Sequence, residues 1–131
     1  ARIFIDDYAH HPQELTALIR GARELYPDKK ITVVFQPHLY SRTKDLAAGF
    51  SKALDLADEV FLLPIYPARE LPMEGVSSQM ILDGMNVKGI MLEKEKLTDT
   101  IRQLQPEVLI TAGAGDIDAL VEPLKNVLTG T

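Results

Sequence analysis

The sequence predicts the doubly wound α/β class: a mostly parallel sheet of five to six strands, covered by helices on both faces. Short apolar runs alternate strictly with segments of helical periodicity, which is typical of parallel strands joined by crossover helices. The runs carry few polar residues, as expected for strands that are buried on both faces. The length of 131 residues is that of one domain, so we expect residues 1–131 to form a single domain.

The first part of the chain supplies two strands and two helices. We expect a strand over about residues 2–6 and a helix over residues 12–25, because the proline at its start lacks an N–H that would have no helical partner there. The β-branched run at residues 31–35 predicts a fully buried strand. Thr43 is the expected N-cap of the second helix, over residues 43–56.

The middle of the chain supplies a strand, a long loop, a short helix and a weak strand. The strand is expected over residues 60–63, and the loop over residues 64–76 is long enough to be functional. Ser77 is expected to cap a helix that reaches residue 85, before a strand over residues 87–92.

The last part of the chain supplies two helices that flank a buried strand. The first helix is expected over residues 94–104, where apolar residues recur at i, i+4 and i+7, and the strand over residues 108–112. A final helix is expected over residues 117–128, and Pro123 within it should kink or split it.

Composition narrows the classes of function. The net charge of −5 and the pI near 5.1 favour neither nucleic acid nor an anionic membrane as a partner. No apolar run is long enough to span a bilayer and no signal-peptide pattern is present, so we expect a cytoplasmic location. Because cysteine is absent, disulfides, thiolate metal sites and a thiol nucleophile are excluded. The chain starts at Ala1, almost inside a strand, which predicts a domain excised from a longer enzyme.

Polar clusters follow four of the five expected strands. Ligands of doubly wound sheets bind beyond the carboxyl ends of the strands, so this edge is the expected site. The densest cluster, from Asp6 to His11, packs two carboxylates, a phenol and two imidazoles into one turn. The other clusters lie at residues 36–42, 66–70 and 113–116.

Four known types of site can be compared with these clusters. A zinc site could use ligands from His10, His11, His38, Asp6 and Asp7, but adjacent histidines at a strand end rarely reach one ion, and no HExxH motif is present. A phosphoacceptor receiver needs an aspartate after the third strand and a lysine after the fifth, and the chain lacks both. Gly113 and Gly115 form a G-x-G without the third glycine of a dinucleotide fingerprint, although such a turn can present N–H groups to an anion. No Walker A loop occurs, so ATP phosphates would need another domain.

Arg42 and His38 are the favoured functional pair outside the first cluster. A guanidinium at the start of a helix suits a carboxylate or a phosphate, and the alternative is a surface ion pair between Arg42 and Asp45. In the long loop, we expect Arg69 and Glu70 to form a solvated pair.

Four segments resemble the C-terminal domain of the Mur ligases, in order and with compatible spacing. They are DDYAHHP at residues 6–12, FQPHLYSRT at residues 35–43, YPA at residues 66–68 and GAGDI at residues 113–117. The second segment is the more specific, and within the family it is closest to the branch that adds L-alanine to UDP-N-acetylmuramate. The resemblance implies the Rossmann-like third domain of a three-domain cytoplasmic enzyme of peptidoglycan precursor synthesis.

The chemistry that the resemblance implies is ATP-driven amide formation. The muramate carboxylate would attack the γ-phosphate of ATP, and the amine of L-alanine would attack the resulting acyl phosphate, with Mg²⁺ neutralising phosphate oxygens. The N-terminal domain would hold the UDP-sugar, and the central domain would hold ATP and Mg²⁺. The third domain would close over both; it would be inactive alone, and no metal ligand is expected in it.

The resemblance also implies roles for individual residues. Asp7 would meet the ATP ribose and Tyr8 would line the nucleotide side, while His10, His38 and Arg42 would be the catalytic groups. The residues expected to line the alanine site are His11, Tyr40, Arg42, Gly113 and Ala114. Many family members have arginine where this chain has Leu39, which puts more weight on Arg42 as the cation for the alanine carboxylate.

Two alternatives remain open at the level of the sequence. One is a murein tripeptide-recycling ligase of the same family, against which the continuation Tyr40–Thr43 argues. The other is a non-catalytic α/β module that binds a nucleotide or a sugar phosphate.

Overall fold

The computed structural model describes residues 2–128, and within them the chain forms a five-stranded, all-parallel sheet in the order β1-β5-β2-β3-β4. The predicted fold class is therefore confirmed, while the two ends of the predicted domain lie outside the described residues. The strands are β1 (Ile3–Asp7), β2 (Ile31–Phe35), β3 (Glu59–Leu62), β4 (Lys88–Met91) and β5 (Val108–Ala112).

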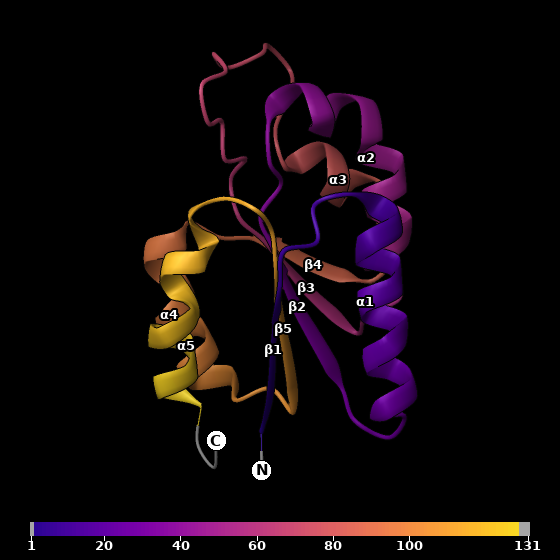
Figure 1. Ribbon diagram of the computed structural model, residues 1–131, viewed down its shortest axis with the longest axis vertical. Coiled ribbons are helices and arrows are strands. Elements are labelled where there is room, and N and C mark those ends of the chain that lie inside the picture. The colour runs from indigo at the N-terminus through magenta and orange to yellow at the C-terminus, as the bar shows by residue number, and fades with distance from the viewer. Residues whose placement is uncertain (1, 129–131) are drawn as a thin grey trace.

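Helices cover both faces of the sheet. Figure 1 shows α1, α2 and α3 on one side and α4 and α5 on the other. These helices, with the 3₁₀ helix η1, are α1 (Pro12–Leu25), α2 (Tyr40–Leu54), α3 (Gln79–Asp83), α4 (Lys94–Leu104), η1 (Asp116–Leu120) and α5 (Val121–Val127). Two cores result: Phe35 and Phe50 pack between the sheet and α1–α3, and Val34 and Leu97 pack on the opposite face.

At two places on the carboxyl edge of the sheet, the connections that follow neighbouring strands run to opposite faces. The strands β1, β2 and β3 lead into helices on one face, whereas β4 and β5 lead into helices on the other. Because β5 lies between β1 and β2, the connections diverge to opposite faces of the sheet around β5. They diverge again between β3 and β4, which lie side by side. Crevices at such switch points are where doubly wound sheets bind ligands.

One predicted helix start is wrong, and another is displaced by one residue. Helix α2 begins at Tyr40, and Thr43 lies inside its first turn, where its hydroxyl donates to the carbonyl oxygen of Leu39 at 2.8 Å. Helix α3 begins at Gln79, one residue later than a Ser77 cap predicts, and ends at Asp83, but the Ser77 hydroxyl does accept a hydrogen bond from Gln79 N, at 3.2 Å. The buried Ser78 hydroxyl, at the N-cap position, donates instead to the carbonyl oxygen of Leu63, at 2.6 Å.

The other boundaries differ from prediction by at most two residues. The predicted bounds of α1, β2, α4 and β5 are confirmed. The split predicted for the last helix is also confirmed: η1 ends at Leu120 and α5 begins at Val121, two residues before Pro123. Proline is tolerated there because N–H groups in a first helical turn lack intrahelical partners.

Candidate functional site

The structure brings three of the predicted residues into one cluster, which we call the histidine cluster: His10, His38 and Arg42. The imidazoles of His10 and His38 lie edge to face, with ring centroids 6.5 Å apart, although they follow different strands. The Arg42 side chain lies one helical turn beyond His38, and its guanidinium contacts Nδ1 of that ring at 3.0 Å. The alternative pairing fails, because Arg42 and Asp45 form no ion pair within residues 2–128.

The contact with Arg42 fixes the protonation of His38. A guanidinium can only donate, so Nδ1 of His38 must accept and the ring proton resides on Nε2. Burial lowers the pKa of His38, and the positive charge of Arg42 lowers it further, with smaller opposition from Glu70. His38 is therefore a neutral imidazole at neutral pH that presents Nε2–H as a donor.

Tyr66 holds the histidine cluster in place, although the sequence indicated it only as part of the segment at residues 66–68. Its ring stacks on that of His38, with centroids 5.7 Å apart and planes inclined by 12°. Its backbone forms a parallel bridge with the same segment: Leu39 N donates to Tyr66 O, and Tyr66 N donates to Pro37 O, both at 2.8 Å. The long loop is thereby fixed to the end of β2.

Glu70 contacts the start of α2, and among the residues that the structure describes it forms no ion pair with Arg69, so the predicted solvated pair is wrong. Its carboxylate accepts hydrogen bonds from the Ser41 backbone N–H at 3.1 Å and from the Ser41 hydroxyl at 2.5 Å. The hydrogen bond from the Ser41 hydroxyl is the main reason why the pKa of Glu70 is lowered. A carboxylate is stabilised at this position because unpaired N–H groups point out of a helix N-terminus.

Gln36 joins the ends of β2 and β5. It is only 4% exposed. Its Nε2 donates to Asp116 Oδ1 at 2.6 Å, and its Oε1 accepts from Ile117 N at 2.9 Å. Asp116 also accepts from Lys94 Nζ at 2.6 Å, and these bonds lower the pKa of Asp116 against the opposing effect of burial. The sequence contained no signal for this network, because its members lie far apart in the chain.

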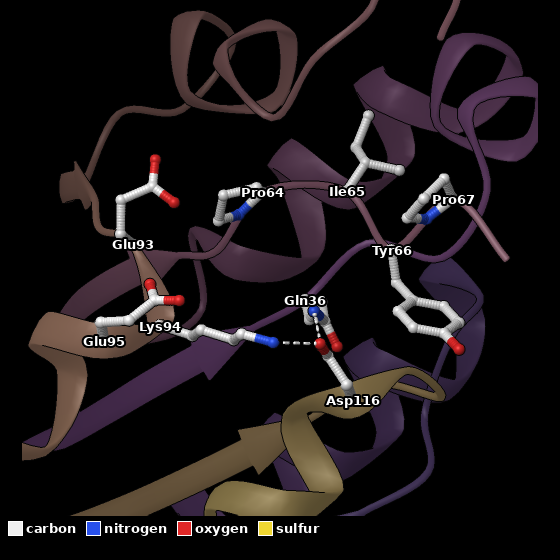
Figure 2. Close-up of a pocket in the computed structure, with 9 residues that line it drawn as sticks. All are labelled: Gln36, Pro64, Ile65, Tyr66, Pro67, Glu93, Lys94, Glu95 and Asp116. Atoms are coloured by element: carbon white, nitrogen blue, oxygen red, sulfur yellow. Dashed lines mark hydrogen bonds and ion pairs between the residues drawn. The ribbon is translucent and has the colours of Figure 1, made fainter. Parts of the chain in front are cut away.

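Figure 2 shows this network at the wall of a cavity of about 190 Å³, where Gln36 and Lys94 both point toward Asp116. Tyr66 lines the same cavity while it stacks on His38, so the cavity and the histidine cluster adjoin across one aromatic ring. The cavity lies near the switch point between β3 and β4. Its remaining lining residues are Pro64, Ile65, Pro67, Glu93 and Glu95.

The turn after β5 is tightly packed at Gly113. Its φ of 147° lies in the region that favours glycine, and a Cβ there would stand 2.9 Å from the carbonyl oxygen of Gln36. Gly113 N donates to Asp7 O at 3.3 Å, which places this turn beside the first cluster. Ala114 is half-buried in the same turn.

The remaining predicted residues lie around these features. Asp7, the last residue of the edge strand β1, accepts a hydrogen bond from Ala9 N at 2.9 Å, and the next residue, Tyr8, is 67% exposed, so both lie at the open rim where β1 ends. His11 is exposed at the N-cap of α1, and Tyr40 is half-buried at the first position of α2.

Neither a metal site nor a membrane-spanning helix is found in the part of the chain that the structure describes. Among residues 2–128, no three His, Cys, Asp or Glu side chains converge in a way that could hold a metal ion. No helix in the same range is long and apolar enough to cross a membrane.

Comparison with known proteins gives consistent results. The family model for the Mur ligase, glutamate ligase domain matches residues 1–117. A UDP-N-acetylmuramate–L-alanine ligase from Flavobacterium johnsoniae is 51% identical over 127 residues, which cover 96% of this chain and 28% of that protein. The crystal structure of UDP-N-acetylmuramate-alanine ligase from Thermotoga maritima matches with a TM-score of 0.67 and 30% identity, over 94% of this chain and 26% of that one.

A further structural match concerns the fold alone. The murein peptide ligase from Psychrobacter arcticus superposes with a TM-score of 0.73 at 17% identity, over 98% of this chain and 28% of that one. The chain thus spans between a quarter and a third of the length of each of these three relatives.

The fold and the site define a doubly wound α/β domain whose polar groups gather at the carboxyl edge of a parallel sheet. The match of the family model to most of the chain makes the next step direct: the chain belongs to the Mur ligase family.

Proposed function

We propose that the chain is the C-terminal domain of an ATP-dependent ligase that joins L-alanine to UDP-N-acetylmuramate during peptidoglycan precursor synthesis. The observation that carries the proposal is the 51% identity, over 96% of the chain, to a relative named for that reaction. Since the chain spans 28% of that relative, the proposed enzyme has further domains that bind the UDP-sugar and ATP.

The histidine cluster is the proposed alanine side of the site. Arg42 supplies a permanent cation for the alanine carboxylate, because the contact of its Nη1 with His38 leaves other guanidinium donors available. His38 donates through Nε2, and the ring of His10 faces it. His11, Tyr40, Gly113 and Ala114 would complete the lining of the proposed alanine site, as the family resemblance implies.

The open rim where β1 ends is the proposed nucleotide side. The exposed ring of Tyr8 offers an apolar face to a base or a ribose, and Asp7 offers a carboxylate to ribose hydroxyls. Mg²⁺ would neutralise charge on the phosphates of ATP. As the family resemblance implies, ATP and Mg²⁺ would be held mainly by the central domain of the proposed enzyme.

A chimaera tests the proposed reaction. Residues 1–131 replace the matching segment of the Flavobacterium johnsoniae ligase. Phosphate release is then measured with UDP-N-acetylmuramate, ATP and either L-alanine or the tripeptide named below. We expect release that depends on L-alanine and not on the tripeptide L-alanyl-γ-D-glutamyl-diaminopimelate. Release with the tripeptide alone would instead favour the recycling ligase, and a folded chimaera that is inactive with both would favour a non-catalytic module.

Calorimetry of the 131-residue chain alone tests the division between domains. We expect no ligase activity and weak ATP binding, because no phosphate loop is present in the sequence. Tight ATP binding by the chain alone would contradict the proposal that another domain holds the phosphates.

A further inference from the structure

Glu14 is an acidic residue beside the histidine cluster to which the sequence had assigned no role. It lies one turn into α1, and its Oε1 accepts hydrogen bonds from the backbone N–H groups of His10 and His11, both at 3.1 Å. The same oxygen lies 3.5 Å from Nδ1 of the His10 ring. The hydrogen bond from the His10 backbone is the main cause that lowers the pKa of Glu14, so this carboxylate is ionised at neutral pH.

The two imidazoles of the cluster have opposite hydrogen-bonding polarity. Nδ1 of His10 lies 2.9 Å from the carbonyl oxygen of Tyr8, which can only accept, so Nδ1 carries the proton and Nε2 keeps its lone pair. In His38, the contact with Arg42 enforces the reverse arrangement. Nε2 of His10 is therefore an acceptor, whereas Nε2 of His38 is a donor.

The two rings also differ in their charged neighbours. Burial and the cation of Arg42 oppose a second positive charge on His38. The ring of His10 is 31% exposed, and the Glu14 carboxylate lies beside its Nδ1 and not its Nε2, which carries the free lone pair. A carboxylate in that position orients an imidazole and stabilises the imidazolium that forms on proton uptake.

We propose that His10 is the general base that takes the proton from the attacking amine, that Glu14 is the positioning residue that stabilises its protonated form, and that His38 acts only as a donor. This assignment rests on the proposed function, because the amine is that of the incoming amino acid. It separates the two histidines, which the sequence motif leaves equivalent.

The proposed step begins with the free amine, which enters with two N–H bonds and whose nitrogen forms the new C–N bond at the acyl carbon. The C–O bond to the phosphoryl group breaks, and phosphate leaves with the electron pair. One amine proton passes to Nε2 of His10, which later releases it to water, and the other remains on the amide.

The first test is kinetic and uses the full-length enzyme that contains this chain. We expect His10→Gln to lower kcat about a hundredfold, the usual contribution of a general base. For Glu14→Gln we expect a fall in kcat of about threefold with an unchanged KM for L-alanine, because the half-exposed pair of Glu14 and His10 is screened by water. Glu24→Gln, on an exposed site of the same helix, is the matched control and should leave kcat unchanged.

A comparison of two Glu14 variants separates charge from helix capping. Glu14→Gln keeps an acceptor oxygen for the two backbone N–H groups but loses the charge, whereas Glu14→Asp keeps the charge on a shorter side chain. We expect the aspartate variant to retain more activity than the glutamine variant. The opposite order would show that Glu14 acts only as a cap, and a loss below threefold in His10→Gln would remove His10 as the base.

The second test uses the 131-residue chain alone and does not depend on ligase activity. Nitrogen-15 spectra of the imidazoles at about pH 8, where free histidine is neutral, report which ring nitrogen carries the proton. We expect Nδ1–H in His10 and Nε2–H in His38, with the preference in His38 weakened by Arg42→Gln. Nε2–H in His10 would overturn the assignment even if the enzyme adds alanine. Conversely, the expected tautomers in a protein without alanine-dependent activity would reject the proposed function alone.

Discussion

Replacing Gln36 with leucine should destabilise the domain far more than the same change on the surface. Gln36→Leu removes the donor to the ionised Asp116 and strands the buried N–H of Ile117. The lost hydrogen bond to Asp116 costs about 1.5 kcal/mol. This is the low end of the range for a hydrogen bond to a charged group, because Asp116 still accepts from Lys94. The second costs about 2 kcal/mol as an unsatisfied buried donor. After an offset of about 0.5 kcal/mol for the more apolar side chain, we expect a net loss of about 3 kcal/mol.

Chemical denaturation followed by circular dichroism measures this loss. A change of about 3 kcal/mol is a large part of the stability of an ordinary domain and should lower Tm by roughly 10 °C. Gln79→Leu is the matched control, since Gln79 donates to Asp83 at 2.8 Å on the exposed surface of α3, where such pairs contribute about 0.2–0.5 kcal/mol. If both variants lose less than about 1 kcal/mol, the argument that Gln36 joins the two strand ends is refuted.

The remaining predictions concern Arg42, His38 and two glycines. Arg42→Ala should raise the KM for L-alanine or lower turnover by roughly tenfold or more in the full-length enzyme, and a wild-type rate would remove its assigned role. The same variant should raise the pKa of His38 by removing a neighbouring cation, as measured by NMR titration of the chain. Because the folded state resists protonation of His38, stability should fall as pH drops below about 6.5 and level off below the folded pKa; in Arg42→Ala this loss should shrink. Gly113→Ala should cost about 1–3 kcal/mol of stability because of the positive φ of Gly113 and the close carbonyl oxygen of Gln36. Gly21→Ala should instead stabilise by about 0.5–1 kcal/mol, because the space around Gly21 in α1 is open. Thermal denaturation of both variants checks this contrast.

The elements that the sequence predicted best are those with a local cause. Helix α1 has proline at its start and one apolar face, and both signals lie within fourteen residues. The strands β2 and β5 are unbroken apolar runs because both of their faces are buried. The clustering of His10, His38 and Arg42 was also predictable in outline, since parallel strands place their carboxyl ends at one edge.

The features that the sequence did not reveal depend on partners far along the chain. Gln36 and Asp116 are 80 residues apart, and each taken alone is an ordinary polar residue in a turn. Glu70 was assigned to its neighbour because no local pattern indicates that it reaches Ser41, 29 residues earlier. Glu14 was overlooked for a different reason: a glutamate three residues after an N-cap has a sufficient structural explanation as half of a capping box.

Leu39 accounts for both the misplaced start of α2 and the shape of the histidine cluster. Its φ of 73° is a conformation that a leucine rarely adopts, so no propensity rule would place a helix cap there. Hydrogen bonds hold it from both sides: Leu39 N donates to Tyr66 O at 2.8 Å, and Thr43 N donates to Leu39 O at 3.1 Å. This sharp turn starts the helix three residues earlier than predicted, which brings the Arg42 guanidinium back to His38 instead of out toward solvent. Local strain of this kind persists only where surrounding contacts hold the backbone in place. Here those contacts hold the segment in which Arg42 sets Nε2 of His38 as the donor.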